Sequence, residues 1–199
     1  HISAGVNRVL VEDNNATGLE VQLADGETEP KHYDAVIATT PSYIFTSLVP
    51  DLPEDYQDKL VNVQYLSAVV VILILDRPLT GKYWISIADR DLPFVGIIEH
   101  TNMIDRSLYG GHHIVYLTNY PDRDSELYRK SAEELVAEFT PHLRQLNPDF
   151  DPSWILEYHH HKVDGAQPII GTNYSQRIPD HRTPIKNLYL ANTTQIYPE

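Results

Sequence analysis

The sequence predicts an α+β fold, in which a mixed or antiparallel sheet carries helices on one face. Four strand patterns follow one another between residues 64 and 118, and a long amphipathic helix pattern occupies residues 125–146. Short strand patterns also stand near both ends of the chain. With 199 residues, the chain is long enough for one substantial core, or for one core and a small satellite.

The first forty residues are rich in strand and turn signals. Residues 5–11 and 19–23 are predicted strands, the second because it alternates apolar and polar side chains as a half-buried strand does. Residues 13–15 and 25–26 are turn signals, since Asn, Asp and Gly accept left-handed backbone angles. A third strand is predicted at residues 33–38, and its apolar centre indicates that both of its faces are covered.

Two short helices and the main sheet are predicted next. Residues 42–49 and 54–61 have helical patterns, and Pro53 with the acidic start of the second suits a helix N-terminus. The four strands that follow are predicted at residues 64–75, 83–88, 94–100 and 112–118. The first of these is almost entirely apolar and β-branched, so we expect it to lie inside the sheet.

The strongest helix prediction covers residues 125–146, where apolar side chains recur every three or four residues. The stripe consists of Leu127, Ala132, Leu135, Val136, Phe139, Leu143 and Leu146. Pro141 should kink this helix or start a new segment. A further strand is predicted at residues 154–163 and a loop or short helix at residues 174–182.

Charge and composition exclude several classes of function. Fifteen Lys and Arg stand against 28 Asp and Glu, a net charge of −13, and no basic cluster occurs, so we expect no nucleic-acid partner. The chain has no cysteine and hence no disulfide or thiolate chemistry. The longest apolar run, residues 66–75, is too short to span a bilayer, and no signal-peptide pattern occurs. These observations predict a soluble, cytoplasmic protein.

Motifs for catalysis and tight phosphate binding are missing. No two of the nine glycines have G-x-G spacing, so the turn that grips a dinucleotide pyrophosphate is absent from this chain. No G-x-S-x-G elbow or H-E-x-x-H pattern occurs, and no catalytic residue is assigned. His159 and His161 would share one face of a strand, but no carboxylate follows at ligand spacing, so we expect no metal site.

The strands at the two ends carry a resemblance to a known family. Residues 33–41 and 186–192 each have a polar entry, an apolar strand core, and then small hydroxyl or amide residues. They resemble the last strands of the FAD-binding half of flavin amine oxidase-like proteins, the group of monoamine oxidases, protoporphyrinogen oxidase and phytoene desaturases. The resemblance covers roughly residues 5–41 and 168–192.

The resemblance implies positions for cofactor and substrate. Val6 matches a valine whose backbone contacts the adenine. The end of the third strand would run beside the FAD, and Asn192 stands where the family has the acidic residue of a Gly-Asp pair. The implied cofactor-binding residues are Val6, Ala38, Thr39, Thr40, Pro41 and Asn192. The implied substrate-facing residues are Gln167, Pro168 and Tyr174.

The implied organisation is discontinuous, and we expect the strands at residues 33–38 and 188–191 to lie in one small sheet apart from the main core. Residues 1–41 and 183–199 would belong to an FAD-binding domain, and residues 42–182 would form a substrate-binding domain. The chain opens on His1 and closes directly after a strand, so we expect a part of a longer FAD-dependent oxidoreductase that transfers hydride from a small-molecule substrate to the flavin. Alone it should be inactive and retain no FAD. A non-redox flavoprotein mutase or isomerase, and a standalone ligand- or protein-binding module, are the alternatives. The substrate, the electron acceptor and the oligomeric state do not follow from the sequence.

Overall fold

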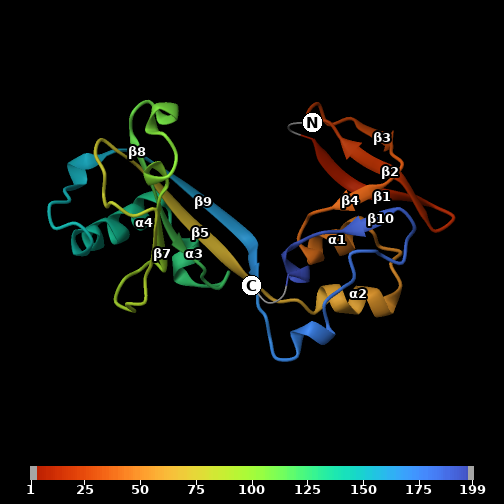
Figure 1. The fold of residues 1–199 in the computed structure, drawn as a ribbon. Helices are drawn as coiled ribbons and strands as arrows, with labels where there is room; N and C mark the ends of the chain where they lie inside the picture. Colours follow the sequence, from red (N-terminus) through yellow and green to blue (C-terminus); the bar gives the residue numbers. More distant parts are fainter. Residues whose placement is uncertain (1–3, 197–199) are drawn as a thin grey trace. The chain divides into compact units, whose positions relative to one another are not determined.

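The computed structural model describes residues 4–196, and they form two compact units (Figure 1). The first unit is built from the chain up to Gln64 and again from Pro168 onward. The second unit is the continuous segment Tyr65–Gln167. The predicted substrate domain began at residue 42 and ended at residue 182, so the compact units have different boundaries. Which unit serves cofactor or substrate remains a prediction.

The first unit opens with a three-stranded antiparallel sheet of order β1-β2-β3. Its strands are β1 (Gly5–Glu12), β2 (Asn15–Gln22) and β3 (Thr28–His32). Asp13 and Asn14 join the first two strands with φ values of 50° and 57°, and Gly26 has φ 88° in the next turn. Both predicted turns are therefore confirmed, because each places a residue that tolerates positive φ where the hairpin needs it. Strand β3 was not predicted, since its proline and charged residues hide the strand pattern.

A second, two-stranded sheet joins the two ends of the chain. Strand β4 (Val36–Ala38) pairs in parallel with β10 (Leu188–Leu190), and Val36 lies opposite Leu188. The prediction that these strands meet in one small sheet is confirmed. The prediction that both faces of β4 are covered is wrong: Val36 is buried, but Ile37 is 65% exposed. Val36 belongs to the core of the first unit and Ala38 packs against it, so it is the face of β4 that carries these two residues that meets the core.

Two helices complete the first unit. Helix α1 (Ser42–Leu48) starts after Pro41 and helix α2 (Glu54–Val61) after Pro53, close to the predicted positions. The core of this unit brings together apolar side chains from before residue 61 and after residue 184. Its buried members are Val9, Ala16, Val36, Phe45, Val49, Leu52, Tyr56, Leu60, Ile185, Leu188 and Leu190. Because the helices share this core with β4 and β10, they belong to the first unit and not to the sheet that follows them.

The second unit contains a five-stranded sheet of order β6-β7-β8-β5-β9. The strands are β5 (Tyr65–Leu75), β6 (Trp84–Ser86), β7 (Gly96–Glu99), β8 (His113–Asn119) and β9 (Ile155–Pro168). The pairs β6–β7, β7–β8 and β5–β8 are antiparallel. Strand β5 lies inside the sheet, between β8 and β9, as its apolar sequence indicated, and the three predicted partner strands β6, β7 and β8 belong to the same sheet.

The predicted helix at residues 125–146 is broken into pieces, which corrects that prediction. Helix α3 (Glu126–Arg129) ends at Lys130, whose ψ of 146° is extended, and α4 (Ala132–Phe139) then starts anew. Ser131 forms a capping box with Glu134, which makes the restart favourable. From residue 140 the chain continues as a 3₁₀ turn, Thr140–Gln145, with Pro141 at its start. The periodicity persisted through these breaks because each piece turns the same side toward the sheet.

The core of the second unit lies between the sheet and this helical segment. Leu135, Phe139 and Leu143 are fully buried, and Val136 is half-buried against the same cluster, which confirms the predicted stripe. They pack on alternate residues of β5 and β8, including Val71. The remaining short 3₁₀ turns are His100–Asn102, Arg106–Tyr109, Pro152–Trp154, Tyr174–Gln176 and Thr193–Gln195.

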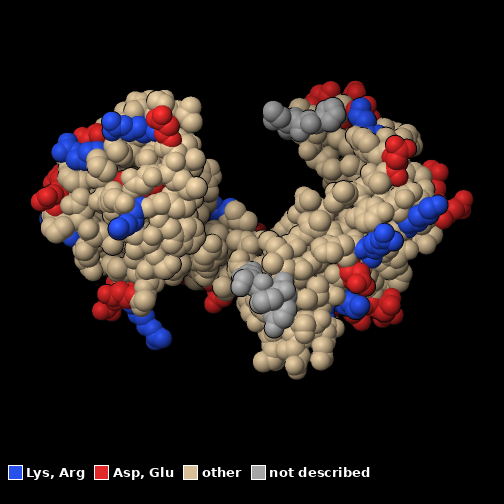
Figure 2. Space-filling model, viewed as in Figure 1, with Lys and Arg blue, Asp and Glu red and all other residues tan. Residues whose placement is uncertain are grey.

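Charged side chains are spread over each unit. On the face shown in Figure 2, Lys and Arg are interspersed with Asp and Glu, and no basic patch gathers there. Within residues 4–196, no helix is long and apolar enough to cross a membrane.

Candidate functional site

The first candidate site is the edge of the small parallel sheet where both of its strands end. Thr39, Thr40 and Pro41 follow β4, and Asn192 follows β10 by two residues. The parallel pairing brings these residues to the same edge, together with Ala38. Ligands of open α/β sheets bind outside the carboxyl ends of the strands. Five of the six residues predicted to bind a cofactor are thus brought together.

A hydrogen-bond network joins the two loops at this edge. The Asn192 amide nitrogen donates to the Thr40 carbonyl (2.9 Å) and to the Ser42 hydroxyl (3.3 Å). The Asn192 amide oxygen accepts from the Thr194 backbone N–H (3.0 Å) and from the Thr194 hydroxyl (2.6 Å). Ser42 and Thr194 also lie within hydrogen-bond distance of each other, at 3.2 Å, and both are fully buried. We call these contacts the Asn192 network.

Tyr174, predicted to face the substrate, supports this network through a hydrogen bond to the backbone of Thr194. Its ring is buried, and its hydroxyl donates to the Thr194 carbonyl at 2.6 Å. Gln195 adds a second support: its side chain accepts from the Asn192 N–H at 3.0 Å and donates to the Pro179 carbonyl at 3.2 Å. The loop after β10 is therefore held from two sides.

The edge has features that fit the polar side of a large ligand. Thr39, Ala191 and Thr193 are exposed, so the loops present small side chains that permit a close approach of a ligand to the backbone. The Thr40 hydroxyl oxygen is buried and has no hydrogen-bond partner within the described part of the chain. A buried hydroxyl without a partner carries a free-energy cost that a ligand's hydrogen bond would remove. The residues present therefore fit a cofactor that lies along this edge.

Val6, the sixth predicted cofactor residue, lies elsewhere in the first unit. It sits on β1, an outer strand of the three-stranded sheet, opposite Val21, and its side chain is 40% exposed. The side of the β1 backbone that faces away from β2 pairs with no other strand of that sheet, and the contact of Val6 with an adenine stays a prediction.

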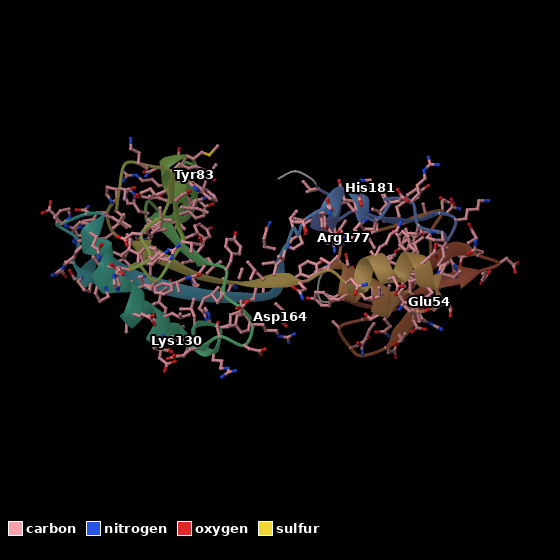
Figure 3. All side chains as sticks on the ribbon, turned by 90° about the horizontal axis from the view of Figure 1, so that it is seen from below. Glu54, Tyr83, Lys130, Asp164, Arg177 and His181 are labelled. Carbon is pink, nitrogen blue, oxygen red and sulfur yellow. The ribbon has the colours of Figure 1, made fainter. Side chains whose placement is uncertain are left out.

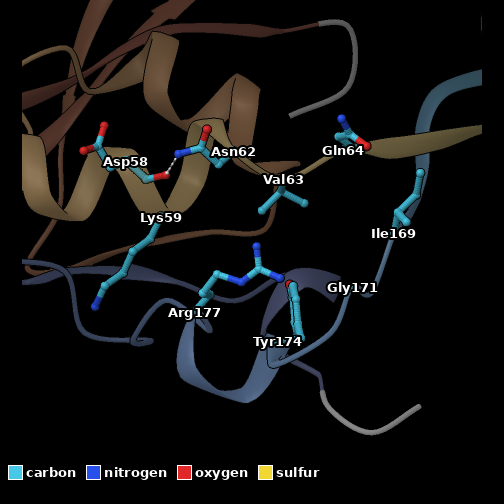
Figure 4. A pocket seen from close by; sticks show the side chains of 9 residues that line it. All are labelled: Asp58, Lys59, Asn62, Val63, Gln64, Ile169, Gly171, Tyr174 and Arg177. Carbon is cyan, nitrogen blue, oxygen red and sulfur yellow. Dashed lines mark hydrogen bonds between the residues drawn. The ribbon is translucent and has the colours of Figure 1, made fainter.

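A pocket of about 590 Å³ opens in the first unit beside Tyr174 (Figure 4). It is lined by Asp58, Lys59, Asn62, Val63, Gln64, Ile169, Gly171, Tyr174 and Arg177. The Arg177 guanidinium lies between Val63 and Tyr174, and it donates to the Thr172 carbonyl at 2.9 Å. Of the residues predicted to face substrate, only Tyr174 lines this pocket. Gln167 is half-buried and Pro168 is buried, both at the end of β9.

Sequence reasoning missed the polar residues of this pocket. Lys59 and Asn62 lie at the end of α2, and Arg177 follows the 3₁₀ turn at Tyr174–Gln176. These segments are more than a hundred residues apart, and no motif connects them. Figure 3 shows Arg177 on the segment that returns from β9 to β10.

In the second unit, the sheet face that points away from the helices is apolar and aromatic. Trp84, Ile98, Tyr116 and Ile72 follow one another across four neighbouring strands. Trp84 is 58% exposed and the other three are half-buried. The His100 ring contacts Tyr116, the third member of this row, edge-on. The face has the character of an apolar ligand wall.

The opposite face of the second unit buries a carboxylate. Glu99 is fully buried, and its oxygens accept from the backbone N–H of Leu79 (3.0 Å) and of Thr80 (2.6 Å), and from the Thr80 hydroxyl (2.8 Å). His113 lies 4.0 Å from the same carboxylate. Burial lowers the pKa of His113, and the nearby Glu99 charge opposes this shift. The hydrogen bonds identify Glu99 as a clamp for the turn after β5.

The histidines of β9 do not assemble a metal site. His159 pairs with Glu157 at 3.2 Å on an exposed part of the strand. His160 lies on the other side and is half-buried, and its pKa is lowered by burial. Across residues 4–196, no three His, Cys, Asp or Glu side chains are grouped so that they could hold a metal ion.

The fold places one unit that is assembled from both ends of the chain around a second, continuous unit that is inserted into it. A family model described as flavin containing amine oxidoreductase matches residues 1–198. The chain therefore belongs to this flavin-containing amine oxidoreductase family, and the family implies FAD as the cofactor of the full-length protein. No protein of curated description is similar enough in sequence to count as a match.

Solved structures with the same fold include oxidoreductases. An oxidoreductase from Methanosarcina mazei is 18% identical with a TM-score of 0.66, over 96% of this chain and 44% of that one. A putative protoporphyrinogen oxidase from Exiguobacterium sp. 255-15 is 15% identical with a TM-score of 0.68, over 96% and 42%. A putrescine oxidase bound to putrescine is 17% identical with a TM-score of 0.65, over 96% and 43%. The chain thus spans less than half the length of these structures.

Proposed function

We propose that this chain is part of an FAD-dependent oxidoreductase, in which the first unit supplies one side of the FAD site and the second unit supplies a wall of the substrate site. The observation that carries the proposal is the parallel pairing of β4 with β10. It gathers Thr39, Thr40 and Asn192 from opposite ends of the chain at the edge where such sheets bind nucleotides. Family membership supports FAD as the nucleotide.

The proposal gives a role to β1, to the loops after β4 and β10, and to the apolar sheet face of the second unit. The outer backbone side of β1 at Val6 receives the adenine, and the loops after β4 and β10 follow the ribityl and phosphate part. When bound, FAD supplies the hydride acceptor, which no side chain of the protein can replace. The residues of the second unit orient the substrate: the row of Trp84, Ile98 and Tyr116 offers an apolar surface that excludes water from a reacting C–H bond.

Of the three residues assigned to substrate binding, Gln167, Pro168 and Tyr174, this proposal keeps one as a candidate for direct contact with the substrate. Tyr174 is buried and its hydroxyl donates to the Thr194 carbonyl, so it supports the loop after β10. It also forms part of the wall of the neighbouring pocket. Gln167 is half-buried at the end of β9, where the chain leaves the substrate sheet. It remains the candidate of the three for direct contact with a substrate.

The chain by itself should not retain FAD. It contributes hydrogen bonds along one edge, each worth about 0.5–1.5 kcal/mol, and it lacks the glycine turn that holds a pyrophosphate. These few bonds do not offset the free energy lost when a free ligand is immobilised. We expect the 199-residue chain to purify colourless and the polypeptide extended to the length of its relatives to bind FAD stoichiometrically.

Titration calorimetry and flavin absorbance on both proteins test this proposal. Micromolar or tighter FAD binding by the short chain would place the main cofactor contacts within it, contrary to our assignment. No binding by the extended polypeptide would refute the flavoprotein proposal and leave a standalone binding module as the better reading.

A non-redox flavoprotein is the second candidate. Reduced UDP-galactopyranose mutase has the same fold, with 15% identity and a TM-score of 0.60 over 86% of this chain. Anaerobic mixing of the flavin-loaded protein with candidate substrates separates the two. In an oxidoreductase, a stoichiometric amount of substrate reduces the flavin and bleaches its absorbance. A mutase converts many molecules of its substrate, and only after the flavin has been reduced.

A further inference from the structure

The Asn192 side chain points into the protein and not toward the exposed edge. We infer that Asn192 is a positioning residue for the FAD site: it ties the loop after β4 to the loop after β10, and exposed Thr39 and the backbone at Thr193 meet the cofactor. This inference rests on the proposed function. It changes the role of Asn192 from a direct contact to a support.

The first argument is that the Asn192 side chain has no hydrogen-bonding capacity left. A side-chain amide can donate two hydrogen bonds and accept two. The nitrogen uses both donors, on the Thr40 carbonyl and the Ser42 hydroxyl. The oxygen accepts both the N–H and the O–H of Thr194. A direct bond from this side chain to a cofactor would have to break one of the four.

The second argument is that the network closes into a ring with one consistent direction. The Thr194 hydroxyl donates to the Asn192 oxygen, so in the 3.2 Å contact between Ser42 and Thr194 the Ser42 hydroxyl must be the donor. Ser42 in turn accepts from the Asn192 nitrogen. The three side chains therefore close a ring, and hydrogen bonds in such rings polarise and strengthen one another. Ser42 and Thr194 are fully shielded from solvent, so water cannot substitute for a lost member.

The third argument concerns the choice of an amide. An ionised carboxylate at position 192 could accept from Thr194 but could not donate to the Thr40 carbonyl or to Ser42. It would place negative oxygen atoms against the carbonyl oxygen of Thr40. Asparagine has the length of aspartate and can both donate to the loop after β4 and accept from Thr194. The acidic residue that the family has at this position can only accept.

The inference leaves a defined set of groups for the ligand. Thr39 and Thr193 are exposed on either side of the Asn192 network, one on each loop. The buried Thr40 hydroxyl next to the network has no partner among residues 4–196. The distance between Thr39 and Thr193 depends on the ring, because the hydrogen bonds of Asn192 and Ser42 join the loop after β4 to the loop after β10.

The test uses the polypeptide extended to full family length, with FAD affinity measured by titration calorimetry and the bound flavin by visible circular dichroism. The variants are Asn192→Asp, Ser42→Ala and their combination. We expect each single variant to bind FAD about tenfold more weakly, because each opens the ring. The double variant should lose little more than the worse single variant, since one ring cannot be opened twice. The circular dichroism of the bound flavin should change in all three.

Asn102→Asp is the matched control. The Asn102 nitrogen also donates to two carbonyls, those of Thr80 (3.2 Å) and Lys82 (3.0 Å), but in the second unit. This variant loses the same chemistry and should bind FAD as the wild type does. Melting temperatures of the FAD-free proteins show which variants are folded at the temperature of the titration. Should Asn192→Asp fail to fold, Ser42→Ala, which removes a single oxygen atom, carries the test.

The outcomes separate the inference from the proposed function. Weaker binding by Asn192→Asp with unchanged binding by Ser42→Ala would show that Asn192 contacts FAD directly and overturn the positioning role. Unchanged affinity and an unchanged flavin spectrum in all variants would overturn it as well, while wild-type binding would uphold the flavoprotein. Absence of FAD binding by the wild type would overturn both.

Discussion

Asn192 shows what a single residue contributes at the edge of the parallel sheet. The resemblance to flavin amine oxidase-like proteins made it a candidate for cofactor contact, and the structure places it at that edge. Its side chain, however, is committed to Thr40, Ser42 and Thr194. Two of these partners lie about 150 residues away along the chain, with sequence separations of 152 and 150. A hydrogen-bond donor can be recognised in a sequence, but its acceptor is set by the fold.

Tyr56 gives a prediction at the same scale. It is buried in the core of the first unit, and its hydroxyl donates to the Asp180 backbone carbonyl at 2.8 Å. Burial, with a smaller contribution from the Asp180 charge, raises the pKa of Tyr56 from 10.0 to about 12. The native state therefore holds this proton more tightly than the unfolded state. The associated stability is fully present below pH 10 and is lost as the pH rises through about 12.

We expect Tyr56→Phe to remove the part of the unfolding free energy that the wild type loses at alkaline pH, which is on the order of 2 kcal/mol. Unfolding free energies of wild type and variant, measured by denaturant titration from neutral pH to the alkaline limit, check it. The difference between the two proteins should shrink as the pH rises through the window. A difference that stays constant with pH would contradict the assigned pKa shift.

At the scale of elements, the structure shows where periodicity was sufficient and where it was not. Strand β5 and the buried stripe of Leu135, Phe139 and Leu143 follow from the sequence, because alternation and helical spacing report which side chains face a core. The interruption of the helix at Lys130 does not follow from periodicity. It depends on the capping box of Ser131, a local hydrogen-bonded signal within a continuous apolar stripe.

The turn after β5 is held by Glu99, which gives a second prediction. Its buried carboxylate accepts three hydrogen bonds from Leu79 and Thr80. Glu99→Ala leaves these donors without a partner, so we expect a loss of about 3 kcal/mol of unfolding free energy. Denaturant unfolding measures it. Glu157→Ala, which removes an exposed carboxylate paired with His159, should change the unfolding free energy by less than about 0.5 kcal/mol. Equal effects of the two substitutions would contradict the clamp.

For the whole molecule, the decisive feature is the presence of two separate cores. The core of the second unit draws only on residues 65–167, and the core of the first unit draws on both flanking segments. The first unit is therefore discontinuous: Ile185, Leu188 and Leu190 complete a core that begins with Val9. Proteins built in this way keep the two segments of the interrupted domain close together.

Separate cores predict separable unfolding. Leu135 and Leu60 are both buried leucines, one in each core. We expect Leu135→Ala to destabilise the second unit and Leu60→Ala the first, each by roughly 2–5 kcal/mol. Hydrogen exchange of backbone amides in each unit, followed by mass spectrometry, resolves the two effects. Loss of protection across both units in either variant would show that the molecule unfolds as one cooperative body.

The sequence by itself determined most of the strands and helices, the stripe of side chains that faces the core of the second unit, and the two strands that pair at the ends of the chain. These properties rest on local periodicity, turn chemistry and short strand-end patterns, all of which are readable along the chain. Tertiary structure alone decided that the helices at residues 42–61 join the first unit, that Ile37 stays exposed, and that Asn192 and Tyr174 turn inward. The physical reason is that burial and hydrogen-bond partners depend on contacts between residues far apart in the chain. Such contacts exist only once the two ends have met at β4 and β10.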